Sequence, residues 1–168
     1  MDKKKKFLRL PVISHGAEYL VMGYLMRRNI LTYKAPPNNE GYDLICIHPD
    51  PKRKSQQIRI QVKSRYATDC DKSFPVKEKS FTAFDYLIIV FLNIGYYYNK
   101  SKKTIEGIKE PEFYTLPVNF VRKYHNNKSV FGKVSLLGMD EVLLDYKNEN
   151  GFELIAKDLR ITYPAKKN

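Results

Sequence analysis

The sequence predicts an α/β or α+β sandwich built around a mixed β-sheet. Three observations support this fold class: an amphipathic stretch near the N-terminus, two strand-like segments separated by a polar turn, and one wholly apolar run in mid-chain. Because helical and strand periodicities alternate along the chain, we expect helices to pack on the faces of one sheet.

The first helix is expected over residues 15–28. Apolar residues recur there at the spacing of a buried helical stripe, Ser14 can serve as the N-cap, and two arginines suit the C-terminal end. A short strand is expected over residues 30–34. The segment 35–41 is rich in Pro, Asn and Gly and therefore predicts a turn.

A β-hairpin and a central strand are expected next. Residues 42–48 and 57–63 are predicted strands on either side of a polar turn, and apolar and polar side chains alternate in the second. Residues 84–93 contain a continuous apolar run, typical of a strand covered on both faces. The remaining expected elements are a strand at 112–116, a helix at 117–124 and a helix at 139–146.

The composition fits a single domain over residues 1–168. Hydrophobic residues make up 43% of the chain and charged residues 29%, which supports a globular core. No apolar run approaches the roughly 20 residues of a transmembrane helix, so we expect no membrane partner. Residues 1–10 are basic and are expected to be flexible rather than a secretory signal. With only two cysteines and no disulfide framework, a cytoplasmic location is expected.

The excess positive charge is concentrated in residues 1–105. The chain has 30 Lys and Arg against 18 Asp and Glu, a net charge of +12. Residues 1–105 hold 20 of the basic and 9 of the acidic residues, which is nearly the whole imbalance. Such an asymmetry is typical of a surface that binds a polyanion, and DNA or RNA is the expected partner. A simple solubility role for these charges is the alternative.

Four polar side chains stand where the pattern otherwise favours apolar residues. Glu18 lies in the first turn of the expected helix, Asp43 begins an apolar strand, and Gln61 and Lys63 share one face of the next strand. The strands of a hairpin are antiparallel, so the start of one lies beside the end of the other. We therefore expect Asp43, Gln61 and Lys63 to cluster at one end of the sheet, with Glu18 held over them.

These residue types suit Mg²⁺ or Mn²⁺. Carboxylate and carboxamide oxygens are hard ligands for such cations, which also recruit phosphate groups. A bound cation eases the deprotonation of water and neutralises charge that builds on a phosphodiester under attack. The Lys63 ammonium beside it would orient or deprotonate the water and stabilise the transition state.

Two short segments carry a family resemblance: Gly41-Tyr42-Asp43-Leu44-Ile45, and Ile60-Gln61-Val62-Lys63-Ser64. Together with Glu18 upstream, they resemble the motifs of the PD-(D/E)XK nuclease superfamily. The resemblance implies the restriction endonuclease-like fold, a three-layer sandwich around a mixed central sheet, and a metal-dependent DNA endonuclease that hydrolyses phosphodiester bonds. It also implies roles: Glu18, Asp43, Gln61 and the backbone carbonyl of Val62 would bind Mg²⁺ or Mn²⁺, and Lys63 would assist the attack.

Two positions depart from the family pattern. Gln61 stands at the (D/E) position, and Tyr42 replaces the proline before Asp43. Superfamily branches with Gln at that place, methyl-directed restriction enzymes and a group of intron-encoded homing endonucleases, are active, so this QxK variant is compatible with activity. The lost negative charge disfavours a tightly held second metal ion.

Basic residues around the expected site are predicted to contact DNA phosphates, which positions DNA without reading its sequence. They are Lys52, Arg53, Lys54, Arg59 and Arg65. Ordinary exposed charge is the alternative for each of them. A nuclease of this size that cuts both strands is expected to act as a homodimer.

Three functions stay open on the sequence alone. A metal-dependent DNA endonuclease is the first, and a catalytically inactive nuclease-fold module that binds DNA or RNA is the second. The third is a basic interaction protein without a site, which predicts that Asp43 and Lys63 lie far apart. Each site residue also has a structural explanation: Glu18 near a helix N-terminus, Asp43 in a turn, and Gln61 and Lys63 on a solvated strand face.

Overall fold

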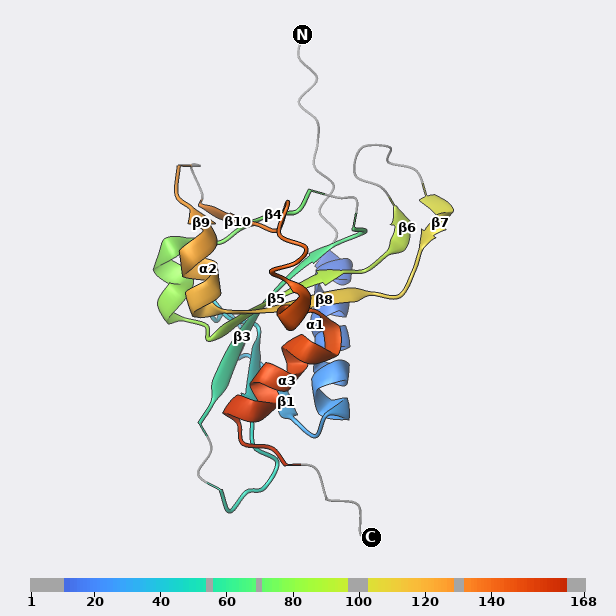
Figure 1. Cartoon of the computed structure of the whole chain (residues 1–168). Helices are drawn as coiled ribbons and strands as arrows, with labels where there is room; N and C mark the ends of the chain where they lie inside the picture. The colour runs from blue at the N-terminus through green and yellow to red at the C-terminus, as the bar shows by residue number, and fades with distance from the viewer. Residues whose placement is uncertain (1–10, 54–55, 69–70, 97–102, 129–131, 163–168) are drawn as a thin grey trace.

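The fold is built around a five-stranded mixed sheet with the strand order β1-β2-β3-β5-β8 (Figure 1). A computed structural model describes residues 11–53, 56–68, 71–96, 103–128 and 132–162. The strands are β1 (Leu31–Lys34), β2 (Leu44–Ile47), β3 (Ile58–Arg65), β5 (Tyr86–Phe91) and β8 (Glu112–Pro117). All neighbours are antiparallel except β3 and β5, which are parallel. The mixed α/β fold and the mixed central sheet are therefore as the sequence predicts.

Helices and two smaller sheets surround the central sheet. The helices are α1 (Pro11–Arg27), α2 (Val118–Tyr124) and α3 (Asn148–Asp158), with 3₁₀ turns η1 (Glu78–Thr82) and η2 (Leu144–Tyr146). A three-stranded sheet joins β4 (Ser73–Pro75), β10 (Lys133–Ser135) and β9 (His125–Asn126), and a hairpin joins β6 (Ile94–Tyr96) to β7 (Lys103–Ile108). None of the described helices is long and apolar enough to cross a bilayer.

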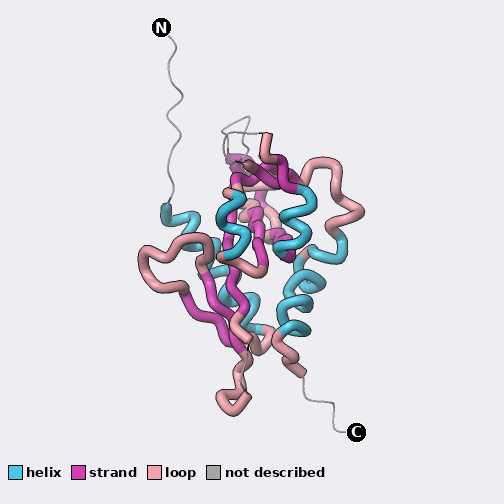
Figure 2. The backbone as a smooth tube through the Cα atoms, turned by 90° about the vertical axis from the view of Figure 1, so that its left-hand side faces the viewer, coloured by secondary structure: helices cyan, strands magenta, loops and turns pink. Residues whose placement is uncertain are grey.

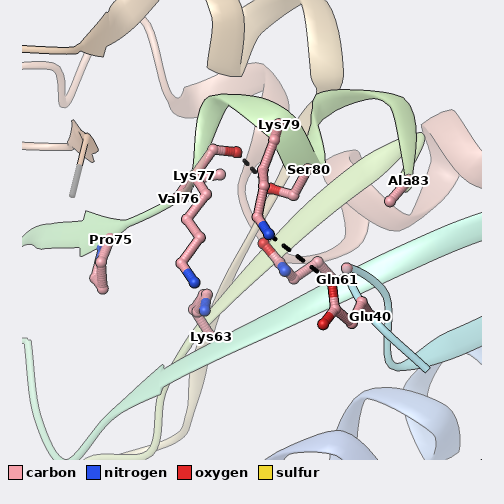
Figure 3. A pocket seen from close by; sticks show the side chains of 10 residues that line it. Glu40, Gln61, Lys63, Pro75, Val76, Lys77, Lys79, Ser80 and Ala83 are labelled. Atoms are coloured by element: carbon pink, nitrogen blue, oxygen red, sulfur yellow. Dashed lines mark hydrogen bonds and ion pairs between the residues drawn. The ribbon is translucent and has the colours of Figure 1, made fainter. Parts of the chain in front are cut away.

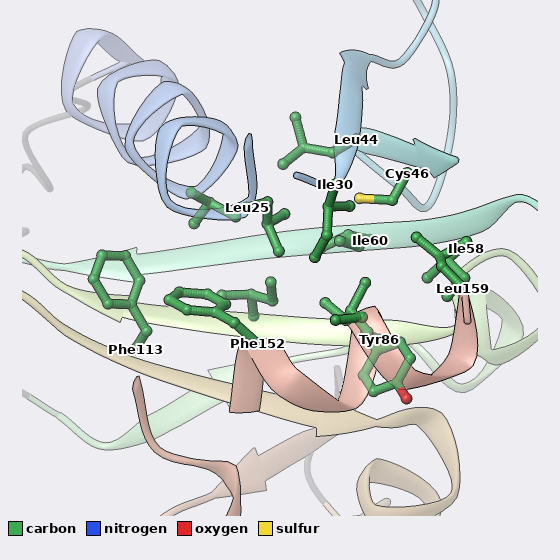
Figure 4. Close-up of a cluster of buried hydrophobic side chains, with 14 of the residues drawn as sticks. Leu25, Ile30, Leu44, Cys46, Ile58, Ile60, Tyr86, Phe113, Phe152 and Leu159 are labelled. Atoms are coloured by element: carbon green, nitrogen blue, oxygen red, sulfur yellow. The ribbon is translucent and has the colours of Figure 1, made fainter. Parts of the chain in front are cut away.

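The central strand β5 separates two hydrophobic cores. Its alternate side chains point to opposite faces, and all six residues of the strand are buried. Tyr86, Ile88 and Val90 join the core under α1 and α3, hereafter the α1-side core (Figure 4). The other three face the core under α2, β4 and η1, hereafter the α2-side core. An apolar run covered on both faces is therefore confirmed.

Strand β3 is apolar on only one face. Ile58, Ile60 and Val62 belong to the α1-side core or pack against it. The alternate residues are polar and lie on the α2 side, next to the apolar face of β5. The sheet therefore changes from apolar at β5 to polar at β3 on that side.

The described part of the β2–β3 turn (residues 48–53 and 56–57) lies at the same end of the molecule as the last described residues, in both backbone views (Figures 1 and 2). Arg53 joins the two segments, since its guanidinium donates to the Arg160 carbonyl at 3.5 Å. The start of β2 is at the other end of this hairpin, four residues away along an extended strand. The hairpin therefore separates its turn from Asp43.

The predicted helix boundaries are wrong at both ends of the chain. α1 begins at Pro11, whose missing N–H is tolerated at a first helical position, so Ser14 lies inside the helix and Glu18 lies beyond its first turn. Residues 139–146 form turns and η2, because they bury Leu143 but leave Leu144 60% exposed and so provide no continuous apolar stripe. The last helix, α3, begins instead at Asn148.

Candidate active site

Asp43 is fixed where the pairing of β2 with β3 ends. Its backbone N–H donates to the Ile60 carbonyl at 2.7 Å, and its own carbonyl accepts from Ala35 at 2.8 Å. The next strand-edge donor of β3, the backbone N–H of Val62, is bound by the Asp43 side chain, whose Oδ2 accepts its hydrogen bond at 2.7 Å. The Asp43 carboxylate thus lies along the free edge of β3.

The backbone of Val62 also presents a carbonyl to this edge. In a strand, the N–H and C=O of one residue point to the same side. Since the Val62 N–H points to Asp43, its carbonyl faces the same space. Ile60 supports this geometry two residues earlier, because its carbonyl accepts from Asp43 on that side.

Gln61 and Lys63 line a cavity on the α2 side of the sheet (Figure 3). Its volume is about 470 Å³. The other lining residues come from the segment before β2 and from the β4–η1 region: Glu40, Gly41, Pro75, Val76, Lys77, Lys79, Ser80 and Ala83. Gln61 Oε1 is buried here without a hydrogen-bond partner. A buried amide oxygen of this kind is costly unless something else binds it.

The environment of Lys63 disfavours its charged form. Burial is the main cause that lowers its pKa, and the nearby cations Arg65 and Lys77 lower it further, while Asp43 raises it. A lysine with a lowered pKa holds a larger neutral fraction, which can accept a proton. Asp43 accepts a hydrogen bond from the backbone of Val62, the residue before Lys63, so Asp43 and Lys63 do not lie far apart, contrary to the third interpretation above.

Glu18 reaches the same end of the sheet from the α1 side. Its largely buried carboxylate forms an ion pair with Lys34, and His15 Nδ1 lies 3.8 Å from the other oxygen. Lys34 pairs with Leu44, the residue after Asp43, which sets Glu18 over the start of β2. The carboxylate of Glu18 therefore binds a lysine ammonium. Among the described contacts, Glu18 has none with Asp43, Gln61 or Lys63.

The oxygens at this end of the hairpin fit a hard divalent cation. Asp43 supplies a carboxylate, Gln61 an unpartnered amide oxygen and Val62 a backbone carbonyl, all of which Mg²⁺ or Mn²⁺ accepts. Glu18 already holds a cationic group, that of Lys34. Within the described residues no group of three or more His, Cys, Asp and Glu is placed to hold a metal. The donor set here therefore combines one carboxylate with two neutral oxygens.

The four described residues among the five predicted DNA contacts are not gathered at this site. Arg59 pairs with Asp85 at 3.5 Å, and Arg65 donates to the carbonyls of Asp71 and Ser73, so both have structural partners. Lys52 and Arg53 lie in the β2–β3 turn, away from Asp43. Lys54 lies outside the described residues.

The sequence interpretation missed the cations that do line the cavity. Lys77 lies between β4 and η1, and Lys79 lies in η1. Their signal was present as Lys77-Glu78-Lys79 after a Phe-Pro pair. This signal can be interpreted only once the position of β4 is known, because β4 is a three-residue strand that pairs with β10 some sixty positions later and leads into Lys77.

The described fold and site define a mixed α/β protein with a lysine-lined cavity at the end of a β-hairpin. No known family and no curated protein matches the sequence. Among solved structures, the chain is similar to the bacterial homing endonuclease I-Ssp6803I, with a TM-score of 0.54 and 15% sequence identity. The match covers 90% of this chain and 94% of that chain. At this identity the similarity establishes a shared fold.

Proposed function

We propose that the chain is a metal-dependent DNA endonuclease of the PD-(D/E)XK, restriction endonuclease-like type. The observation that carries the proposal is the hydrogen bond from the backbone N–H of Val62 to the Asp43 carboxylate, because the residues on either side of Val62 are Gln61, with its unpartnered oxygen, and Lys63, which lines the same cavity. The fold shared with a homing endonuclease and the net charge of +12 support it.

Asp43, Gln61 and the carbonyl of Val62 would hold Mg²⁺ or Mn²⁺, and Glu18 would join them on exchanging Lys34 for the metal. The bound cation supplies Lewis-acid stabilisation of the charge that develops on the phosphodiester. Asp43 needs no reorganisation for this role, because the Val62 N–H already orients its carboxylate. Gln61 gains the partner that its buried oxygen lacks.

Lys63 would act on the attacking water and on the scissile phosphate. With its pKa lowered by burial, the amine orients the water and accepts its proton in the neutral form. In the charged form it stabilises the extra negative charge of the transition state. Because the described residues offer one such site, cutting both strands of a duplex calls for two copies of the chain, and a homodimer on DNA is part of the proposal.

Incubation of the purified protein with supercoiled plasmid and Mg²⁺ or Mn²⁺ tests the proposal. We expect nicked and linear products with the wild type, no products with EDTA, and a loss of at least about a hundredfold in Asp43→Ala and Lys63→Ala. The matched controls are Glu141→Gln and Lys157→Ala, which remove one exposed charge each elsewhere on the chain. Nicking that persists undiminished in Asp43→Ala and Lys63→Ala would contradict the assignment.

A nuclease-fold module that binds DNA or RNA without cutting is the second candidate. It is favoured by the missing charge at Gln61 and by the ion pair of Glu18 with Lys34. Titration calorimetry separates the two functions, since only the endonuclease requires uptake of Mn²⁺. Absence of Mn²⁺ uptake together with salt-sensitive nucleic-acid binding identifies the binding module.

A further inference from the structure

Three lysines from two separate elements line the cavity beside the candidate site. Lys63 lies on β3, and Lys77 and Lys79 lie at the start of η1. Figure 3 shows the side chain of Lys77 directed from the β4–η1 connection toward Lys63. Both amines, and that of Lys79, belong to side chains that line the same cavity. The fold thus brings like charges together at one place.

The acidic groups nearby only partly balance these charges. Lys79 Nζ lies 4.0 Å from Glu40 Oε2, but the two side chains are 72% and 90% exposed, so this pair is weak. Neither Lys63 nor Lys77 forms an ion pair with a carboxylate in the part of the chain that the structure describes. A bound anion would relieve the repulsion between them.

Hydrogen bonds hold the backbone at Lys77. Its carbonyl accepts from the backbone N–H of Ser80 at 2.9 Å and from the Ser80 hydroxyl at 2.6 Å. The preceding residue, Val76, is 2% exposed, and its carbonyl lies 2.8 Å from His125 Nε2. The backbone from which the Lys77 side chain leaves is therefore held by a 3₁₀ turn and a packed histidine.

We propose that Lys77 and Lys79 form a phosphate-binding position beside Lys63, which holds the DNA backbone group next to the scissile phosphate. The β4–η1 connection then clamps the strand, in place of the β2–β3 turn. For the choice of DNA as the polyanion, this inference rests on the proposed function. Lys77 and Lys79 position the strand, whereas Lys63 faces the reacting phosphate.

Salt-dependent DNA binding tests the proposal without requiring cleavage. The affinity of the full chain for a fluorescently labelled DNA duplex is measured by anisotropy in EDTA over a range of KCl concentrations. Each lysine that neutralises a phosphate contributes about one unit to the slope of log K against log salt. We expect Lys77→Ala and Lys79→Ala each to reduce the slope by about one, and Lys77→Arg to restore it because it keeps the charge.

Lys157→Ala, on α3, controls for the general loss of positive charge and is expected to leave the slope unchanged. Lys52→Ala, in the β2–β3 turn, tests the competing position for the phosphate contact, and our proposal expects a smaller effect there than in Lys77→Ala. Equal slopes for Lys77→Ala and Lys157→Ala overturn the inference. So does a slope reduction in Lys52→Ala with none in Lys77→Ala, because the turn is then the clamp.

Plasmid nicking measured on the same samples keeps the two proposals apart. Unchanged slopes in the Lys77 and Lys79 variants, with normal nicking by the wild type, overturn the clamp and leave the endonuclease standing. Reduced slopes with no nicking by the wild type in Mg²⁺ or Mn²⁺ support the clamp and overturn the endonuclease.

Discussion

The Asp43 carboxylate accepts a 2.7 Å hydrogen bond from the backbone N–H of Val62, the residue between Gln61 and Lys63. This contact ties the start of β2 to the part of β3 that carries both polar side chains. Because it uses a backbone donor, it keeps the carboxylate in place whatever side chain stands at position 62. The relative positions of the site residues therefore follow from the pairing of one hairpin.

Asp43→Asn separates the charge of this side chain from its hydrogen bond. The asparagine oxygen can still accept from Val62, so the free energy of unfolding should stay within about 1 kcal/mol of the wild type. Plasmid nicking should nevertheless fall at least about a hundredfold, because the metal loses its anionic ligand. Asp43→Ala should lose the hydrogen bond as well and unfold more easily in urea. Near-normal nicking by the asparagine variant would exclude a metal-binding role.

Gln61→Met removes the unpartnered buried oxygen at nearly constant volume. If Gln61 serves only the fold, its replacement should change neither metal binding nor nicking. If Gln61 is a metal ligand, Gln61→Met should lower the affinity for Mn²⁺. The free energy of unfolding should stay unchanged or rise by up to about 1 kcal/mol, since an unsatisfied polar atom is lost. Calorimetry with Mn²⁺ and urea unfolding measure the two effects, and Gln61→Glu should bind Mn²⁺ more tightly.

Lys63→Met should stabilise the protein at neutral pH. The pKa of Lys63 is lowered in the folded state, chiefly by burial and further by Arg65 and Lys77, against the attraction of Asp43. Below the folded pKa, the wild type bears the full cost of holding this ammonium. Between the folded pKa and the ordinary 10.5, the unfolded chain binds more protons, so wild-type stability rises with pH.

The stability difference between Lys63→Met and the wild type should therefore be largest at neutral pH and shrink as the pH approaches 10.5. Urea unfolding at a series of pH values measures it. A difference that stays constant across this range would mean that the pKa of Lys63 is the same in the folded and unfolded states.

Gly41→Ala should distort the segment that leads into Asp43. Gly41 has φ +97°, a conformation that L side chains rarely adopt, and a Cβ there would lie 2.5 Å from Cβ of Ala83. We expect a loss of about 2 kcal/mol or more in stability, together with weaker nicking. Gly23→Ala is the matched control, because a Cβ on this α1 residue meets nothing within 4 Å. It should stabilise the helix by roughly 0.5–1 kcal/mol in thermal unfolding, and equal effects of the two changes would rule out the close packing at Gly41.

The hairpin and the central strand could be predicted from the sequence because their side-chain patterns are local. Alternation in residues 57–63 indicates a strand with one buried face, and the apolar run in 84–93 indicates a strand buried on both faces. The antiparallel pairing of β2 with β3 then brings Asp43 to Gln61. The same pairing rule accounts for the closeness of Asp43 to Lys63. The site geometry on β2 and β3 was thus accessible before the structure.

The cavity wall was not accessible in this way, because it depends on pairings between distant segments. β4 has three residues and is recognisable only by its partner β10, so Lys77 gave no sign that it faces Lys63. The last helix was misplaced for a related reason, since the apolar residues within 139–146 belong to turns that pack against the α2-side core. Arg65 looked exposed in an alternating strand, yet it binds the carbonyl of Ser73.

A crystal of the protein soaked with Mn²⁺ gives the most direct test that the end of the β2–β3 hairpin is a metal site. Anomalous scattering should locate a cation within about 2.0–2.3 Å of the Asp43 carboxylate, Gln61 Oε1 and the Val62 carbonyl, with Lys63 beside it. Crystals that show no cation at Asp43, or a cation bound only elsewhere on the chain, would contradict the metal-dependent endonuclease.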